Sequence, residues 1–323
     1  MAEGKFRRKA ILRRMGIALL ATLLALLLGE VILYFVLGNL DVAPLVRHPS
    51  DGRCVGLEPG GEATYTGTGL RIPAVNQDAN QYGYRGTPRA RQPSSGRTRI
   101  VALGDSYTFG VGVTADEALP AALEAALDAD DRPVEVLNFG IPGLDLDEVT
   151  DQYRRFARQW EPSIVVYFLF ENDLDQGLCD LADRTTFMWL LRYSRIFRLG
   201  VVNLAPDALG APDPRSTPER IARLRRGLTE LRDLVSRDGA RLVVVGLADP
   251  LRDAQATQSI TDQLEIPGLI FDRRDYERLE QIPHEGHWTA AATRSAAHTI
   301  ASWLVSEHVL DQAGPNPAQR RPR

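Results

Sequence analysis

The chain has 323 residues, of which 44% are hydrophobic and 25% are charged, and its formal net charge is −4. This composition is ordinary for a globular protein. Beyond the N-terminus the basic residues are scattered, so the sequence lacks the basic stripe that nucleic-acid binding needs, and no nucleic-acid partner is expected.

A basic N-terminal segment, residues 1–14, precedes a nearly uncharged run at residues 15–40. A bilayer core takes about 20 apolar residues, so this run is long enough to cross a membrane. It is longer than the apolar core of a cleaved signal peptide, and no A-x-A pattern follows it. The sequence therefore favours an uncleaved transmembrane signal anchor, with a cleaved signal as the alternative.

The basic flank of such an anchor stays in the cytoplasm. This predicts a single-pass protein of the inner (cytoplasmic) membrane whose catalytic domain is periplasmic or extracellular. The only charge within the run is Glu30. We expect it to face a partner helix or to lie near the outer end of the span, and an intramembrane function is the alternative.

Residues 41–96 are rich in Gly, Pro, Thr and polar residues, which predicts an irregular lead-in with a few short strands. Cys54 in this segment and Cys179 further along are the only cysteines. In an exported protein the two can form a disulfide, but their separation in sequence leaves pairing and two free thiols as open alternatives. A four-thiolate zinc site is excluded.

From residue 97 the sequence alternates between strand and helix patterns. Strands are expected at residues 98–104, 134–140, 163–170, 240–250 and 268–274, and helices at 118–127, 145–160, 216–239 and 289–310. This alternation predicts an α/β protein with a mostly parallel sheet covered by helices on both faces, a three-layer α/β/α sandwich. The aromatic and leucine-rich stretch at 174–215 predicts a lid-like insertion, and the tail at 311–323 is expected to be disordered.

Polar residues or glycines stand where the strands end. Ser106, Gly140 and Asn172 follow the first three strands, and His287 precedes the last helix. Ligands of such sheets bind beyond the carboxyl ends of the strands, so these residues are expected to share one rim. Acyl transfer needs a nucleophile, a base and donors for an oxyanion. The Ser106 hydroxyl, the His287 imidazole, the backbone N–H groups of Ser106 and Gly140, and the Asn172 amide fit these roles.

The segments "GDSYTFG", "NFGIPG", "FEND" and "HEGHW", in this order, are similar to the four sequence blocks of the SGNH (GDSL-type) hydrolases, over roughly residues 97 to 305. The segment "NQYGYRG" at 80–86 resembles membrane-anchored bacterial members. The resemblance implies a flavodoxin-like sheet within a hydrolase domain at 97–310, and ester hydrolysis of small acyl groups, lipids or decorated glycans. It implies that Ser106 is the nucleophile, that Gly140 and Asn172 complete the oxyanion hole, and that His287 is the base.

Two positions depart from the family pattern. Phe170 replaces the glycine of the third block, which leaves the asparagine in place. His284 stands where the family has an Asp that orients the catalytic imidazole, and a neutral histidine cannot stabilise an imidazolium as a carboxylate does. A Ser–His dyad oriented by a backbone carbonyl is favoured. The candidate orienting side chains are Glu285, Asp272 and His284.

The sequence therefore predicts a membrane-anchored, extracytoplasmic serine esterase that acts on an ester of a lipid or a cell-envelope glycan. No cofactor is expected, and "HEGH" lacks the HExxH spacing of a metal site. The same residues fit an O-acyltransferase that uses a sugar hydroxyl in place of water. A non-catalytic binding protein of the same fold is a further alternative, because the acid at position 284 is lost.

Overall fold

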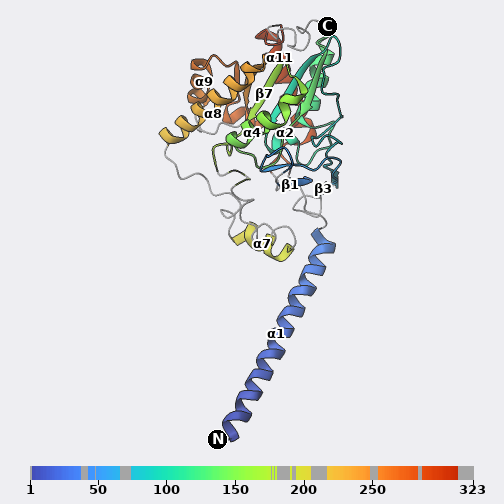
Figure 1. Ribbon diagram of the computed structural model, residues 1–323, viewed down its shortest axis with the longest axis vertical. Helices are drawn as coiled ribbons and strands as arrows, with labels where there is room; N and C mark the ends of the chain where they lie inside the picture. The colour runs from blue at the N-terminus through green and yellow to red at the C-terminus, as the bar shows by residue number, and fades with distance from the viewer. Residues whose placement is uncertain are drawn as a thin grey trace.

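The computed structural model describes residues 2–37, 43–47, 49–65, 74–175, 177, 179, 190, 194–204, 217–247, 254–282 and 286–311. It begins with one long helix, α1 (Ala2–Leu37), which projects away from the rest of the protein (Figure 1). Its segment Ile11–Leu33 is 23 residues long with a mean hydropathy of 2.4, so it is long and apolar enough to cross a bilayer. The large apolar side chains from Ile11 to Ile32 are 46% to 65% exposed, and a helix that is apolar on every side requires a cover of lipid or protein.

A five-stranded sheet forms the centre of the domain, in the order β6-β5-β7-β8-β9. Its strands are β5 (Thr98–Gly104), β6 (Val134–Asn138), β7 (Ile164–Leu169), β8 (Arg241–Gly246) and β9 (Gly268–Ile270), and every neighbouring pair is parallel. The three inner strands are almost wholly apolar and buried, as expected for strands covered on both faces. Numbered along the chain, the strand order is 2-1-3-4-5, which is the flavodoxin-like order, so the predicted fold class is confirmed.

Helices cover both faces of this sheet (Figure 1). Leucines and other apolar residues of α4 (Leu146–Arg155) and α8 (Thr217–Arg237) pack on one face, in a core with Val101, Val165 and Val244. Those of α3 (Leu119–Ala129) and α11 (Ala290–Ser306) pack on the other face, with Ile100, Val166 and Val243. Alternate residues of each strand thus enter opposite cores, because successive side chains of a strand point to opposite sides. A further helix, α9 (Ala254–Gln263), lies beside the edge strand β9.

The prediction of one helix over residues 145–160 is wrong at its C-terminal end. The α-helix ends at Arg155, and a 3₁₀ turn, η1 (Ala157–Trp160), follows a residue with φ of −128° at Phe156. The break lets the rings of Phe156 and Trp160 meet at 5.1 Å between their centroids, and Trp160 also contacts Phe139 and Tyr84. Packing of distant aromatic side chains therefore overrides the local helical pattern.

The expected fifth strand is also shorter than 268–274. It ends at Ile270, and the short helix α10 (Arg273–Arg278) follows. The Asp272 side chain accepts the Asp275 N–H at 2.8 Å, so a cap residue starts the helix where the sequence pattern suggested more strand.

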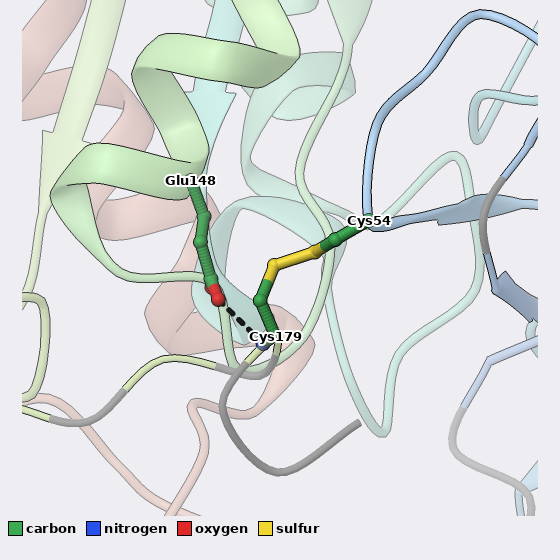
Figure 2. A group of neighbouring side chains, drawn as sticks. All are labelled: Cys54, Glu148 and Cys179. Atoms are coloured by element: carbon green, nitrogen blue, oxygen red, sulfur yellow. Dashed lines mark hydrogen bonds between the residues drawn. A yellow bond between two sulfur atoms is a disulfide. The ribbon is translucent and has the colours of Figure 1, made fainter. Parts of the chain in front are cut away.

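The lead-in forms two small antiparallel pairs, β1 (Leu45–Arg47) with β2 (Val55–Leu57) and β3 (Thr64–Tyr65) with β4 (Val75–Asn76). Cys54 and Cys179 form a disulfide with 5.8 Å between their Cα atoms, which joins this lead-in to the chain beyond β7 (Figure 2). The Cys179 N–H donates to Glu148 Oε1 at 2.5 Å. Glu148 is therefore part of this junction, and the two sulfurs beside it are bonded to each other rather than free as thiolate ligands for a metal.

Only part of the expected lid-like insertion at 174–215 falls within the described residues. Its helix α7 (Arg195–Leu204) contacts α1, and Figure 1 shows it beside the end of α1 that is nearer to the domain. Residues 205–216 and most of 176–193 lie outside the described residues, as do residues 312–323 of the expected disordered tail.

Candidate active site

Ser106 stands at a sharp turn from the first strand of the sheet into a short helix, α2 (Ser106–Phe109). The turn needs a glycine before it: Gly104 has φ of +148°, and a Cβ there would lie 2.3 Å from Thr108 Oγ1 and 2.8 Å from the Phe168 oxygen. Asp105 caps the helix by accepting the Tyr107 N–H at 3.0 Å. The turn leaves Ser106 half-buried at the carboxyl edge of β5, where the strand order reverses and ligands of such sheets bind.

His287 lies just before α11. The Ile282 N–H donates to the His287 carbonyl at 2.6 Å, and the Thr289 N–H donates to the Glu280 carbonyl at 2.9 Å, so residues 280–282 pair with residues 287–289. Thr289 then caps α11 by accepting the Ala292 N–H. Backbone hydrogen bonds on both sides therefore fix where the imidazole is presented.

The structure brings Ser106 and His287 together on the wall of one small pocket. Its volume is about 10 Å³, which is room for about one water molecule. The other lining residues are Tyr107, Gly110, Val111, Val113, Trp288 and Thr293. A hydroxyl and an imidazole are the groups that acyl transfer uses as nucleophile and base, so the two residues that line this pocket are candidates for these roles.

Asn172 lies in the turn after β7 and is exposed. Its carbonyl accepts the Asp175 N–H at 2.8 Å, and its side-chain amide makes no hydrogen bond within the described part of the chain. The amide is therefore available as an uncharged donor at the carboxyl edge of the sheet.

Gly140 follows β6 and is buried against α2. A Cβ there would lie 2.4 Å from the Phe109 nitrogen, so only glycine allows this contact. However, its N–H donates to Asn138 Oδ1 at 3.0 Å, and Asn138 also donates to the Phe109 carbonyl at 3.2 Å. The N–H that the sequence assigns to an oxyanion is thus occupied by Asn138 in this structure. The sequence signal for this was an Asn two residues before a glycine, which is the spacing of an Asx turn.

The second glycine of the same block, Gly143, differs from Gly140. It is exposed, its φ is +84°, and its N–H has no partner among the residues that the structure describes. It lies on the loop between β6 and α4, at the same edge as Ser106. Gly143 is therefore a backbone donor at this edge that the sequence reasoning missed.

The candidate orienting side chains do not gather behind the imidazole in the part of the chain described here. Asp272 is exposed and caps α10. His284 and Glu285 lie outside the described residues. The prediction of a dyad, and that of Glu285 or His284 as orienting group, therefore stay predictions.

Two tyrosines hold the loop that carries His287. The Tyr107 hydroxyl lies 2.5 Å from the Gly286 carbonyl and 2.6 Å from the Tyr276 hydroxyl. The Tyr107 ring also lies 5.2 Å from the imidazole, 5.1 Å from Trp288 and 4.2 Å from Phe170, measured between centroids. The residue next to Ser106 thus binds the residue next to His287. Phe170, which stands where the family has a glycine, packs on the Tyr107 ring.

A buried arginine of the lead-in holds the other end of α2. Arg85 is 1% exposed, and its guanidinium donates to the carbonyls of Phe109 (2.7 Å), Gly110 (2.6 Å), Val113 (2.6 Å) and Asn76 (3.0 Å). It also lies 4.6 Å from the centre of the Phe109 ring. Burial lowers the pKa of Arg85 to about 10, so it stays charged at neutral pH. The hydrogen-bond partners of Arg85 lie up to 28 residues away in the sequence. Its place in the segment "NQYGYRG" was the only feature of the sequence that pointed to Arg85.

Two buried carboxyls lie beneath the site, Asp105 and Asp173. Burial raises the pKa of Asp105 to about 6, against hydrogen bonds from Tyr107 and Ser106 that lower it. Burial, and then the charge of Asp105, raise the pKa of Asp173 well above its usual value. Asp173 accepts from the Tyr167 hydroxyl at 2.5 Å and from the Phe170 N–H at 2.9 Å. Because each charge disfavours the other, at least one of the two carries a proton at mildly acidic pH.

The chain matches one family model and is similar to several solved structures. Residues 102–264 match the GDSL-like Lipase/Acylhydrolase family, a segment that holds Ser106, Gly140 and Asn172 and ends before His287. Among solved structures, the chain is similar to the lipase/acylhydrolase from Enterococcus faecalis, with 14% identity, 65% of this chain and 96% of that chain covered, and a TM-score of 0.42. It is also similar to the esterase EstA from Pseudoalteromonas sp., with 14% identity, 66% and 98% covered, and a TM-score of 0.42. No curated protein sequence matches the chain.

Proposed function

The chain belongs to the GDSL-like lipase and acylhydrolase family and is an ester hydrolase, and from this premise we propose that Ser106 is its nucleophile and His287 its general base. The observation that carries the proposal is the shared pocket of these two side chains at the carboxyl edge of the sheet. The position of Ser106 at the strand-to-helix turn supports it, because the turn exposes the hydroxyl on an otherwise buried strand end.

In this mechanism Ser106 Oγ attacks the carbonyl carbon of the ester while His287 accepts the hydroxyl proton. The C–O bond to the alcohol then breaks, and the alcohol leaves with the proton from His287. This leaves an acyl group on Ser106. A water molecule, deprotonated by His287, attacks that acyl group and releases the acid, which restores the Ser106 hydroxyl.

The negative charge on the carbonyl oxygen needs fixed N–H donors. Among the described residues, neither the side-chain amide of Asn172 nor the backbone N–H of Gly143 has a hydrogen-bond acceptor, which supports both as donors. The Gly140 N–H joins them only when Asn138 releases it. We propose Asn172 and Gly143 as the donors that are ready in this conformation, with Gly140 as a third donor after rearrangement of Asn138.

We further propose that the enzyme is held at the cytoplasmic membrane by α1, with its basic end in the cytoplasm and its catalytic domain outside. The length and hydropathy of Ile11–Leu33 and the basic residues before it support this placement. The substrates are then esters found at the outer side of that membrane, on a lipid or on a cell-envelope glycan. Fusion of a reporter enzyme to the C-terminus tests this placement. Activity of a reporter that functions only in the cytoplasm would contradict a catalytic domain outside the cytoplasm.

Labelling with a fluorophosphonate probe tests the nucleophile. We expect the folded full-length chain in detergent to be labelled, and we expect Ser106→Ala to abolish labelling with an unchanged circular dichroism spectrum. Absence of labelling in folded wild-type chain contradicts the assignment of Ser106 and favours a binding protein. A panel of short-chain, long-chain and acetylated-glycan esters then identifies the acyl group, and added sugar acceptors that take up the acyl group in preference to water would reveal an acyltransferase.

A further inference from the structure

Glu30 of α1 caps the N-terminus of α7. Its carboxylate accepts the Ser194 hydroxyl, the Arg195 N–H at 2.8 Å and the Ile196 N–H at 3.1 Å. The first N–H groups of a helix have no partner within the helix, and a carboxylate at that end also interacts favourably with the helix dipole. The contact therefore uses the one charge of the apolar run to fix a helix that comes 164 residues later in the chain.

The depth of this contact follows from its position on α1. Glu30 lies within the segment Ile11–Leu33, three residues before its end, which is about 4.5 Å along the axis at 1.5 Å per residue. A carboxylate at that depth in a bilayer is costly unless its oxygens accept hydrogen bonds. The donors at the start of α7 supply them, so where α1 spans a membrane the start of α7 lies at the edge of its hydrocarbon core.

Close packing accompanies the cap. Gly29 precedes Glu30, and a Cβ at Gly29 would lie 3.1 Å from Ile196 Cδ1. A small residue on a membrane helix lets a second helix approach closely, as in other helix pairs in lipid. The apolar Ile196 side chain therefore packs directly on α1 beside the cap.

The last residue of α7 is apolar and exposed. Leu204 is 87% exposed, the most exposed large apolar side chain in the described part of the chain. α7 is rich in apolar residues and has arginines only in its first half, at 195 and 198. Helices that combine apolar and cationic residues in this way lie in the headgroup region of bilayers.

We propose that α7 is an interfacial helix whose partner is the lipid bilayer, and that Glu30 holds it against the membrane anchor. This inference rests on the proposed anchoring by α1. The bilayer is the occupant that fits, because α7 is fixed to the apolar segment that the bilayer would surround. α7 then serves as a second membrane contact rather than as part of a free lid.

The test uses the full-length chain in vesicles of phosphatidylcholine and phosphatidylglycerol, with the native disulfide intact. A single added cysteine carries an environment-sensitive NBD label at Leu204→Cys on α7, at Leu27→Cys on α1, or at Ser306→Cys on α11 as a control away from the membrane. Lipids that carry a nitroxide below the headgroup quench labels in their vicinity. We expect severalfold stronger quenching and a blue-shifted emission at position 204 relative to position 306.

The position 27 label separates the two proposals. Quenching at 27 without quenching at 204 overturns the role of α7 while anchoring by α1 stands, and absence of quenching at 27 overturns both. Glu30→Leu should reduce quenching at 204 towards the level at 306 and leave position 27 unchanged. Glu30→Gln, which keeps an acceptor oxygen, should retain more quenching at 204 than Glu30→Leu. Equal quenching at 204 in all three proteins would contradict the proposed cap.

Discussion

The guanidinium of Arg85 donates to the carbonyl of Gly110, 2.6 Å away, at the residue where the helix that begins with Ser106 ends. A side chain of the lead-in thus binds the end of the short helix that begins with Ser106, the proposed nucleophile. The lead-in is therefore part of the support of the site, although it lies outside the sheet.

Replacement of Arg85 should affect catalysis more than replacement of an equally buried arginine elsewhere. Arg99 is also 1% exposed and binds the carbonyls of Ala90, Arg91, Gln92 and Trp160 and the carboxylate of Glu135, on β5 but away from the nucleophile. Each buried carbonyl left without a donor costs about 1–3 kcal/mol, so Arg85→Met and Arg99→Met should both lower the free energy of unfolding strongly. Only Arg85→Met should also lower kcat of the folded fraction, by about tenfold or more, because α2 is no longer held in place.

Chemical rescue sharpens this comparison. Arg85→Ala leaves space for a guanidinium ion, which should restore part of kcat at concentrations well below those that unfold the protein. Ester hydrolysis in the presence and absence of guanidinium, with sodium as the control cation, measures the effect. Identical kcat values for folded Arg85→Met and Arg99→Met would show that Arg85 is merely structural.

Loss of the Tyr107 hydroxyl should impair the base. Tyr107→Phe removes the hydrogen bond to the Gly286 carbonyl and frees the loop that carries His287. The matched control is Tyr153→Phe, because Tyr153 is also buried and its hydroxyl binds Asp238 at 3.0 Å, away from the site. Both changes should cost about 1 kcal/mol in stability. Only Tyr107→Phe should lower kcat and shift the acidic limb of the pH–rate profile, with a smaller effect on KM; equal profiles for the two variants would rule out a positioning role.

Asn172→Ala should lower kcat by about 10² to 10³-fold, the usual effect of removing one oxyanion donor. Because the Asn172 side chain is exposed and makes no hydrogen bond within the described residues, the free energy of unfolding should change by less than about 0.5 kcal/mol. Glu171→Ala, at the exposed neighbouring position, is the control and should keep kcat within about twofold. Steady-state kinetics and urea unfolding of both variants check this. An unchanged kcat in Asn172→Ala would remove Asn172 from the proposed mechanism.

Ionisation of Asp105 and Asp173 should lower the free energy of unfolding as pH rises from about 4 towards neutral. Their folded pKa values lie above the unfolded value of 3.8, so in this range the native state binds more protons than the unfolded state. The stabilisation is complete below the unfolded pKa and is lost as pH passes the folded pKa, about 6 for Asp105. Asp51 has the opposite effect, because hydrogen bonds from Arg53 outweigh its burial and lower its pKa below the ordinary value of 3.8. Its contribution to stability is therefore lost only as pH falls below about 3.8.

Urea unfolding of the wild-type chain and of Asp173→Asn at pH 5 and pH 8 measures this contribution. Asp173→Asn keeps an acceptor for the Tyr167 hydroxyl and the Phe170 N–H but cannot ionise. It should therefore lose less stability than the wild type between the two pH values. An equal or larger loss in the variant would mean that this pair does not carry the pH dependence.

The sequence was sufficient for the features that depend on local pattern. The strands around Val101, Val165 and Val244 were visible because each is a short apolar run bounded by polar residues, and their order along the chain implied the parallel sheet. The proposed nucleophile and base, Ser106 and His287, stand out in the sequence because each lies at the end of an element. By contrast, the end of α4 at Arg155 depends on the rings of Phe156 and Trp160 meeting those of Tyr84 and Phe139 from two other stretches of the chain, and no local pattern contains that information.

The residues that support the candidate site could not be recognised from the sequence where their partners lie far along the chain. Arg85 reads as one more charged residue of a loop until its carbonyl partners are placed around it. Asp272 looked like a strand-end carboxylate suited to catalysis, and in the structure it caps a helix. The hydrogen bond between Asn138 and Gly140 and the cap that Asp272 forms with Asp275 were within reach of local reasoning, because the partners are two and three residues apart.

The bond between Cys54 and Cys179 makes a covalent ring of the intervening chain, and this ring includes Ser106. A single protease cut anywhere inside it leaves both pieces attached to α1. Where α1 anchors the enzyme in a membrane, as proposed, its release therefore requires cleavage between α1 and Cys54, in a stretch of fewer than twenty residues, or reduction of the disulfide together with a cut inside the ring.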